Sequence, residues 1–164
     1  TYGDETIYIT SSDNYDYSQE IWRGGDKTIL VNVAMASAKY IRLPEATTSN
    51  KGLHIKVIYG LAPAAATYVG FATSVIVGGA TSISDATEGA CTAAPALKSS
   101  ASGTSNLRVE LDVDAAAKAG GHPGTVLEFW YPGVANVVMY RGSLIGDVDT
   151  PTLASHFSTT AVNA

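Results

Sequence analysis

The three histidines of this chain are the residues with the broadest chemistry, as metal ligands or as general acids and bases. His54, His122 and His156 are far apart in the sequence, and none lies in a ligand spacing such as HxH or HExxH. His54 falls on the polar face of an expected strand, and His122 lies in a turn rich in Gly and Pro. We therefore expect structural roles for these two residues and no shared metal site.

Acidic residues form two close pairs, Asp112 with Asp114 and Asp147 with Asp149. A calcium loop needs a longer series of oxygen ligands with a glycine at a fixed place, and neither pair has one. Glycoside hydrolysis needs two carboxylates on either side of a pocket, a separation that sequence does not establish. The chain also lacks a GxSxG nucleophile motif and a GxxxxGK[ST] phosphate loop. The sequence therefore predicts a protein that is not an enzyme and carries no cofactor.

Aromatic residues offer one binding chemistry that needs no alignment of charges. Trp22, Trp130 and Tyr131 could form a surface on which sugar rings stack. The competing interpretation places the same rings in the core, and exposure of an aromatic cleft would distinguish the two.

Alternating apolar and polar residues predict the strands that position these side chains. In the run from Tyr40 to Gly60, each half has one apolar face, and a polar loop that begins at Pro44 and ends at Gly52 joins the halves. We expect these two short strands to pair. Further strands are expected after the Gly24-Gly25 turn, within residues 68–77, from residue 107 to 113, and as a hairpin over residues 124–145.

These strands predict an all-β fold, a single antiparallel β-sandwich or barrel-like domain at residues 27–145. An Ala/Thr/Ser-rich excursion over residues 80–105 should form a long loop, and the polar face of strand 107–113 should be solvated. Residues 146–164 form a C-terminal tail without periodicity, expected to lie along the surface or a neighbour.

Residues 1–26 read as an extended, acidic, Tyr-rich N-terminal arm. Aromatic side chains on a polar arm suit anchoring to a neighbouring subunit, because they bring large contact area at low entropy cost. They could equally cover the arm's own domain. The candidate partner-contact residues are Tyr2, Tyr8, Tyr15, Tyr17 and Trp22.

Composition favours an assembly component over a nucleic-acid or membrane protein. Charged residues are 15% of the 164 residues, against about 25% in typical domains. A net charge of −5 opposes a phosphate-binding surface, so no nucleic-acid partner is expected. No stretch approaches the roughly 20 apolar residues of a membrane helix, so no membrane partner is expected. Cys91 is the only cysteine, which excludes an intrachain disulfide.

Two runs carry a resemblance to a known family. IRLPEATTSNKGLHIKV has a strand ending in Leu-Pro, an Ala/Thr/Ser loop, Lys-Gly and an alternating strand. GTVLEFWYPGVANVVMYRG is a glycine-led pair of strands with an aromatic centre. Together they resemble structural proteins of tailed bacteriophages, which include capsid decoration (cement) proteins and related tail-fibre β domains.

The resemblance implies a decoration protein that binds the major capsid protein on the outer capsid surface of a virion. It also implies a homo-oligomer, a trimer in many such proteins, and it supplies no catalytic motif. The alternative is a receptor- or carbohydrate-binding module of a tail fibre or other appendage, with a host-surface glycan as partner.

Overall fold

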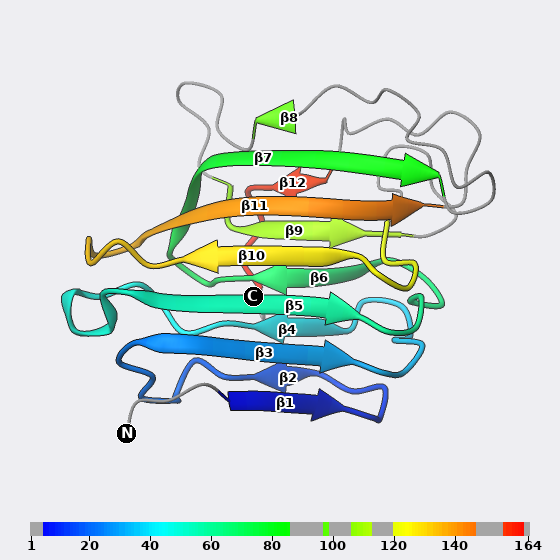
Figure 1. Ribbon diagram of the computed structural model, residues 1–164, viewed down its shortest axis with the longest axis horizontal. Helices are drawn as coiled ribbons and strands as arrows, with labels where there is room; N and C mark the ends of the chain where they lie inside the picture. Colours follow the sequence, from blue (N-terminus) through cyan, green and yellow to red (C-terminus); the bar gives the residue numbers. More distant parts are fainter. Residues whose placement is uncertain (1–4, 86–96, 99–105, 113–119, 147–155, 163–164) are drawn as a thin grey trace.

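The computed structural model of the chain describes residues 5–85, 97–98, 106–112, 120–146 and 156–162, which form two β-sheets (Figure 1). The larger sheet contains β1 (Glu5–Ile9), β3 (Gly25–Val31), β5 (Leu53–Tyr59), β7 (Val75–Asp85), β8 (Leu97–Lys98), β10 (Val126–Trp130) and β11 (Val137–Gly146). The smaller sheet contains β2 (Tyr15–Asp16), β4 (Tyr40–Arg42), β6 (Thr67–Gly70), β9 (Arg108–Leu111) and β12 (Phe157–Ser158).

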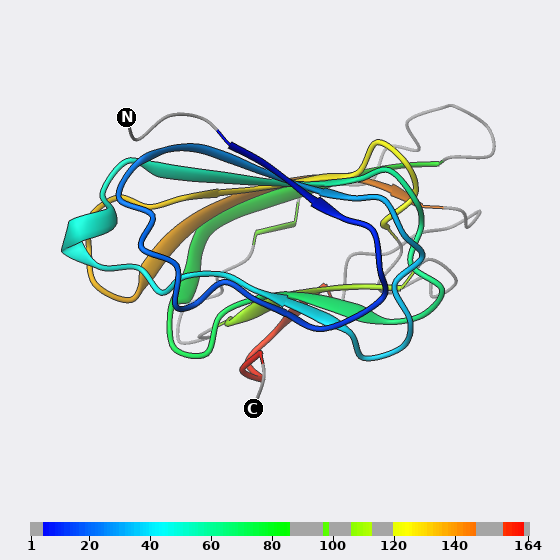
Figure 2. The same ribbon diagram turned by 90° about the horizontal axis from the view of Figure 1, so that it is seen from below.

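The two sheets lie face to face as two layers (Figure 2). Their strand orders are β1-β3-β5-β10-β11-β7-β8 and β12-β9-β6-β4-β2. Among the described residues, the only helical segment is the short 3-10 turn η1 (Thr48–Asn50). The expectation of an all-β fold is therefore confirmed.

The first seven strands alternate between the two sheets along the chain. Each connection crosses from one layer to the other, so strands that neighbour each other within a sheet run in the same direction. The pairs β1–β3, β3–β5, β2–β4 and β4–β6 are all parallel, as is β7–β11. The expected antiparallel arrangement is thus wrong, because both sheets are mixed.

The segment from Tyr40 to Gly60 shows how two strands that follow each other in the chain come to lie in different sheets. β4 and β5 have the expected alternation, but they lie in different sheets and do not pair. The loop between them crosses the core, where Leu43 and Ala46 are buried. Gly52, with a φ of 84°, then turns the chain into β5. Alternation identifies the buried face of a strand, but it does not identify the neighbouring strand.

The later part of the domain agrees better with the sequence pattern. The expected hairpin is present as the antiparallel pair β10–β11, with Trp130 opposite Met139. β9 is also present, but its polar face is not solvated. Arg108 donates to Glu110 Oε1 from Nε at 2.9 Å and from Nη2 at 2.6 Å, and Glu110 is buried. The Arg108 guanidinium also lies 3.8 Å from the ring centroid of Tyr68, which covers it further.

The N-terminal segment is part of both sheets in the residues described. β1 forms one edge of the larger sheet and β2 one edge of the smaller sheet (Figure 1). Main-chain pairing with β3 and β4 holds these strands in place, so residues 5–26 do not form a separate extended arm. Their polar composition reflects edge positions, where only one side of a strand is covered.

The expected excursion and tail also take part in the sheets. β7 continues to Asp85 beside β11. Pairing with β11 provides hydrogen-bond partners for the β7 backbone despite its Gly- and Ala-rich sequence. Residues 86–96 and 99–105 of the expected loop lie outside the described residues. In the tail, β12 pairs with β9, and Val162 is buried and donates its backbone N–H to the Phe71 carbonyl at 2.9 Å. The described part of the tail therefore packs against its own domain.

The core lies between the layers and contains a chain of aromatic contacts. Phe71, which follows β6, meets Phe129 of β10 edge to face at 5.8 Å between ring centroids. Tyr140 of β11 contacts Phe129 at 5.2 Å and Phe157 of β12 at 5.4 Å. These contacts join the two sheets at both the middle and the C-terminal edge.

We expect Gly70→Ala to destabilise the protein, because Gly70 lies directly against β9. An added Cβ would meet the Leu107 carbonyl oxygen and would lie 2.6 Å from Arg108 Cα. Overpacking of this kind costs about 1 to 3 kcal/mol of unfolding free energy, which urea denaturation measures. Gly24→Ala is the matched control, since its Cβ would meet only the Lys51 carbonyl oxygen at 3.6 Å. Equal stability of the two variants would contradict the tight packing of β6 on β9.

Candidate functional site

Three aromatic residues stack in a row at the N-terminal edge of the smaller sheet. Tyr15 lies on β2, Tyr17 follows it, and Trp22 precedes β3. The ring centroids of Tyr15 and Tyr17 are 6.4 Å apart, and those of Tyr17 and Trp22 are 5.6 Å apart. All three rings are partly buried against the core. This aromatic row therefore covers the edge of the domain to which it belongs.

Tyr17 is the central ring of the row and stays neutral at physiological pH. Burial, followed by the nearby Tyr15 and Glu20, raises the pKa of Tyr17 to about 12. Its backbone N–H donates to the Arg42 carbonyl at 2.9 Å, which continues the β2–β4 pairing. The row is thus fixed by the sheet as well as by stacking.

A hollow of about 210 Å³ lies beside the last ring of the row. One wall is the segment from Ser18 to Arg23, which carries Trp22, and the other is the loop that joins β4 to β5. The lining residues are Ser18, Glu20, Ile21, Trp22, Arg23, Pro44, Glu45, Thr47, Ser49 and Asn50. The hollow therefore places an aromatic ring beside hydroxyl, amide and charged groups that can form hydrogen bonds with a polar ligand.

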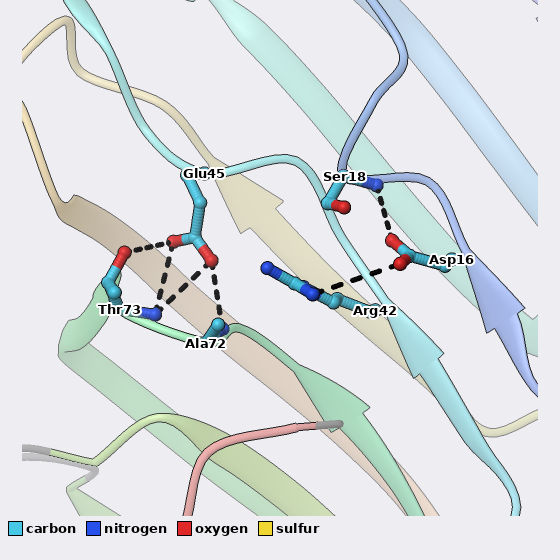
Figure 3. Close-up of polar contacts among 6 residues, drawn as sticks. All are labelled: Asp16, Ser18, Arg42, Glu45, Ala72 and Thr73. Carbon is cyan, nitrogen blue, oxygen red and sulfur yellow. Dashed lines mark hydrogen bonds and ion pairs between the residues drawn. The ribbon is translucent and has the colours of Figure 1, made fainter. Parts of the chain in front are cut away.

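Glu45 fixes the loop wall of the hollow. Its carboxylate faces the connection between β6 and β7, where Figure 3 shows the bonds from Ala72 and Thr73, and it accepts from Ser74 as well. The backbone N–H groups of Ala72, Thr73 and Ser74 donate at 2.8, 3.2 and 2.7 Å, and the hydroxyls of Thr73 and Ser74 donate at 3.0 and 2.6 Å. Ser74 Oγ in turn accepts the Ala46 N–H at 2.8 Å. We call this arrangement the Glu45 clamp.

The Glu45 clamp keeps its carboxylate ionised. Burial by itself raises the pKa of Glu45, but the hydrogen bonds from Ser74, Ala72 and Thr73 together outweigh it. The pKa of the carboxyl therefore lies below its ordinary value, as expected for a carboxylate that accepts several N–H bonds.

The remaining loop residues are held in a similar way. The Tyr131 hydroxyl donates to the Pro44 carbonyl at 2.8 Å from within the core. Asn50 donates from Nδ2 to the Glu45 carbonyl at 2.9 Å, and its Oδ1 accepts the Thr47 N–H at the same distance. This wall of the hollow is consequently preformed.

Arg42 and Asp16 tie the opposite wall to β4. Asp16 Oδ1 accepts the Ser18 N–H at 2.9 Å, and Asp16 Oδ2 lies 3.8 Å from Arg42 Nη1 (Figure 3). The contact with Ser18 and the Arg42 charge lower the pKa of Asp16 against a smaller effect of burial. The turn that leads to Trp22 is therefore anchored at its start.

A second candidate surface is the outward side of the larger sheet, here called the outer sheet face. None of the described strands or loops crosses it in Figure 1, where the larger sheet lies in front. Tyr8, Leu30, Ile58 and Val126 lie next to one another across β1, β3, β5 and β10. Tyr8 is 65% exposed, and the other three are partly exposed. Apolar side chains of adjacent strands thus form a continuous row on this face.

A second row on the outer sheet face contains His54, Trp130 and Met139. The His54 and Trp130 rings stack at 4.8 Å with an interplanar angle of 5°, and Met139 beside them is 43% exposed. His54 Nδ1 lies 3.3 Å from Asp26 Oδ1. The polar face on which the sequence places His54 is therefore not open to solvent at this residue, since the His54 side chain is only 15% exposed.

A charged row separates the two apolar rows. Lys56 lies beside Glu128, with 4.0 Å between Nζ and Oε1, and Glu128 is opposite Arg141. The outer sheet face therefore combines aromatic, aliphatic and paired charged groups.

The predicted site residues separate into three groups. Tyr15, Tyr17 and Trp22 come together in the aromatic row, and Tyr8 lies exposed on the edge strand β1. Tyr2 lies outside the described residues. The expected sugar-stacking trio does not form one surface, because Trp22 and Trp130 belong to different sites and Tyr131 is 2% exposed in the core. Burial removes Tyr131 as a stacking platform.

Sequence reasoning missed Glu45, the best-bonded side chain of the candidate site. Its position directly after Pro44, in a predicted loop, gave no indication of a partner 27 or more residues later in the chain. Of the two acidic pairs of the sequence, Asp114, Asp147 and Asp149 lie outside the described residues, so the structure tests neither pair as a site. The part of the chain that the structure describes holds no group of three or more His, Cys, Asp or Glu side chains placed to bind a metal.

Compared with known protein families, known proteins and solved structures, the chain shows no significant match. No helix in the described ranges is both long and apolar enough to cross a membrane.

We expect Glu45→Gln to destabilise the protein by about 1 to 3 kcal/mol, the cost of leaving buried donors without acceptors. The amide would place an NH2 group against N–H and O–H donors that now face an oxygen. Urea unfolding at neutral pH measures the loss. Glu20→Gln is the matched control, because this exposed carboxylate has no hydrogen bond or ion pair in the described residues. If both variants were as stable as the parent chain, the clamp would contribute nothing.

The Glu45 clamp also predicts an acid dependence. A carboxyl whose pKa is lower in the folded state stabilises the fold above its unfolded pKa, near 4.5. That contribution is lost as the pH falls below 4.5 and through the lowered folded pKa. The unfolding free energy of the parent chain should therefore drop more steeply on acidification than that of Glu45→Gln. Parallel pH profiles of the two proteins would contradict this assignment.

Proposed function

We propose that this chain is a structural protein of a tailed-bacteriophage virion that decorates the outer capsid surface and bridges neighbouring capsid subunits. The observation that carries the proposal is the outer sheet face, which none of the described strands or loops crosses and which has two apolar rows on either side of a charged row. The resemblance of the runs at residues 41–57 and 124–142 to phage virion proteins supplies the identity of the partner.

The composition of the outer sheet face supports protein binding. Aromatic residues, Met and Arg are enriched in protein interfaces, and Tyr8, Trp130, Met139 and Arg141 provide them here. Strand-borne side chains are held by the sheet, so little side-chain entropy is lost when a partner covers them. The neighbouring edge of β1 offers backbone groups that can extend the contact.

Decoration stabilises a shell by mass action. A protein that binds only the assembled capsid adds about 2.7 kcal/mol per site at a hundredfold excess over its dissociation constant. A homo-oligomer, and a trimer in particular, would place several outer sheet faces against several capsid subunits at once, which strengthens binding through effective concentration.

We expect Met139→Glu to weaken capsid binding about tenfold or more, because it places a charge among apolar contacts. The measurement is co-sedimentation of the chain with capsids of the encoding phage from which decoration has been removed. Leu61→Glu is the matched control, since Leu61 is similarly exposed, at 46%, and lies in the connection after β5. Light scattering of the free chain tests the trimer.

Two results would contradict the proposal at different levels. Equal loss in both variants would place the contact elsewhere than the outer sheet face. No binding of the parent chain to any capsid preparation, with no gain in capsid heat resistance, would reject decoration itself.

The alternative, a carbohydrate- or receptor-binding module of a virion appendage, is favoured by one separate observation, the hollow beside Trp22. The residues that line this hollow do not belong to the outer sheet face.

A further inference from the structure

We propose that the hollow beside Trp22 is a binding site for a single neutral sugar unit. Its volume is about 210 Å³, below the roughly 300 to 1,000 Å³ of sites for drug-sized ligands. One pyranose ring is a ligand of matching size. The site is separate from the proposed capsid-binding surface, because none of its lining residues lies on the strands that form the outer sheet face.

Trp22 provides the apolar platform. Tyr17 covers one part of the indole at 5.6 Å between ring centroids, and Tyr15 supports Tyr17 in turn. The rest of the partly buried ring lines the hollow. Since the row is packed against the core, the indole is held in place before a ligand arrives.

Glu20 and Arg23 add hydrogen-bonding groups to the lining that holds that platform. Both lie on the same segment as Trp22, both are exposed, and neither side chain has a hydrogen bond or ion pair in the described part of the chain. A sugar hydroxyl donates and accepts at once. The Glu20 carboxylate can accept from one hydroxyl while the Arg23 guanidinium donates to its neighbour.

The loop wall adds hydroxyl groups opposite Trp22. Thr47 Oγ1 and Ser49 Oγ are 2.9 Å apart, and both residues are exposed at the hollow. The Glu45 clamp and Asn50 hold this loop from behind. Aromatic and polar groups therefore converge on a hollow with two fixed walls, the arrangement that small-molecule sites share.

The charges of the hollow select a neutral ligand. Glu20 and Glu45 carry negative charges and Arg23 carries one positive charge, so the lining residues have a net charge of −1. An anionic sugar such as a uronic acid would be repelled, whereas neutral hexoses and N-acetylhexosamines would not.

The test is an NMR titration of the full chain with methyl glycosides of glucose, galactose, mannose and N-acetylglucosamine. The chain has two tryptophans, and Trp130→Phe assigns the indole N–H signal of Trp22. We expect at least one neutral glycoside to shift this signal saturably without shifting that of Trp130. Glucuronic acid should bind more weakly.

Two substitutions test the polar groups without touching the core. Glu20→Ala and Arg23→Ala should each weaken binding about tenfold or more, the effect of losing a hydrogen bond to a charged group. Asp13→Ala is the matched control, because Asp13 is exposed and does not line the hollow. The proposal fails if no neutral glycoside shifts Trp22, if Trp130 responds equally, or if the affinity is unchanged in both variants. Equal affinity for glucuronic acid would overturn the selection for neutral sugars.

Discussion

The contact between the Glu45 carboxylate and the β6–β7 connection is the interaction on which the arrangement of the two layers depends. Glu45 lies where the chain crosses from the smaller sheet to the larger one, and Ala72 to Ser74 lie where it makes the same crossing again. Backbone donors at a crossing have no strand partner, and buried donors without partners are costly. One ionised side chain satisfies three of them and joins the two crossings.

The alternation of successive strands between the two sheets explains why the sequence predicted some parts of the fold and not others. Apolar alternation in β4 and β5 correctly identified their buried faces, because burial depends on each strand alone. The partner of a strand depends on where its connection leads. For β10 and β11 the short turn enforces a hairpin, whereas for β4 and β5 the clamp and the buried Leu43 direct the loop across the core.

The candidate site was predictable to a smaller extent. Trp22, Tyr15 and Tyr17 stood out because aromatic residues are conspicuous in a polar segment, but the turn that leads to Trp22 is anchored by Asp16 and Arg42 from different strands. Neither Glu45 nor the hollow has a signature in local spacing, since the groups that meet there come from three separate parts of the chain. Convergence of this kind is a property of the fold and not of any segment.

The same clamp also explains how the two proposed binding surfaces can coexist on a small domain. Rigid crossings keep the loop at the end of the layers apart from the strands of the outer sheet face, so a ligand in the hollow does not compete for that face. A domain seated on a capsid through its larger sheet would keep the Trp22 hollow open to solvent at its end. Shell stabilisation and sugar binding are therefore compatible in one attached molecule, and neither surface needs the other to be occupied.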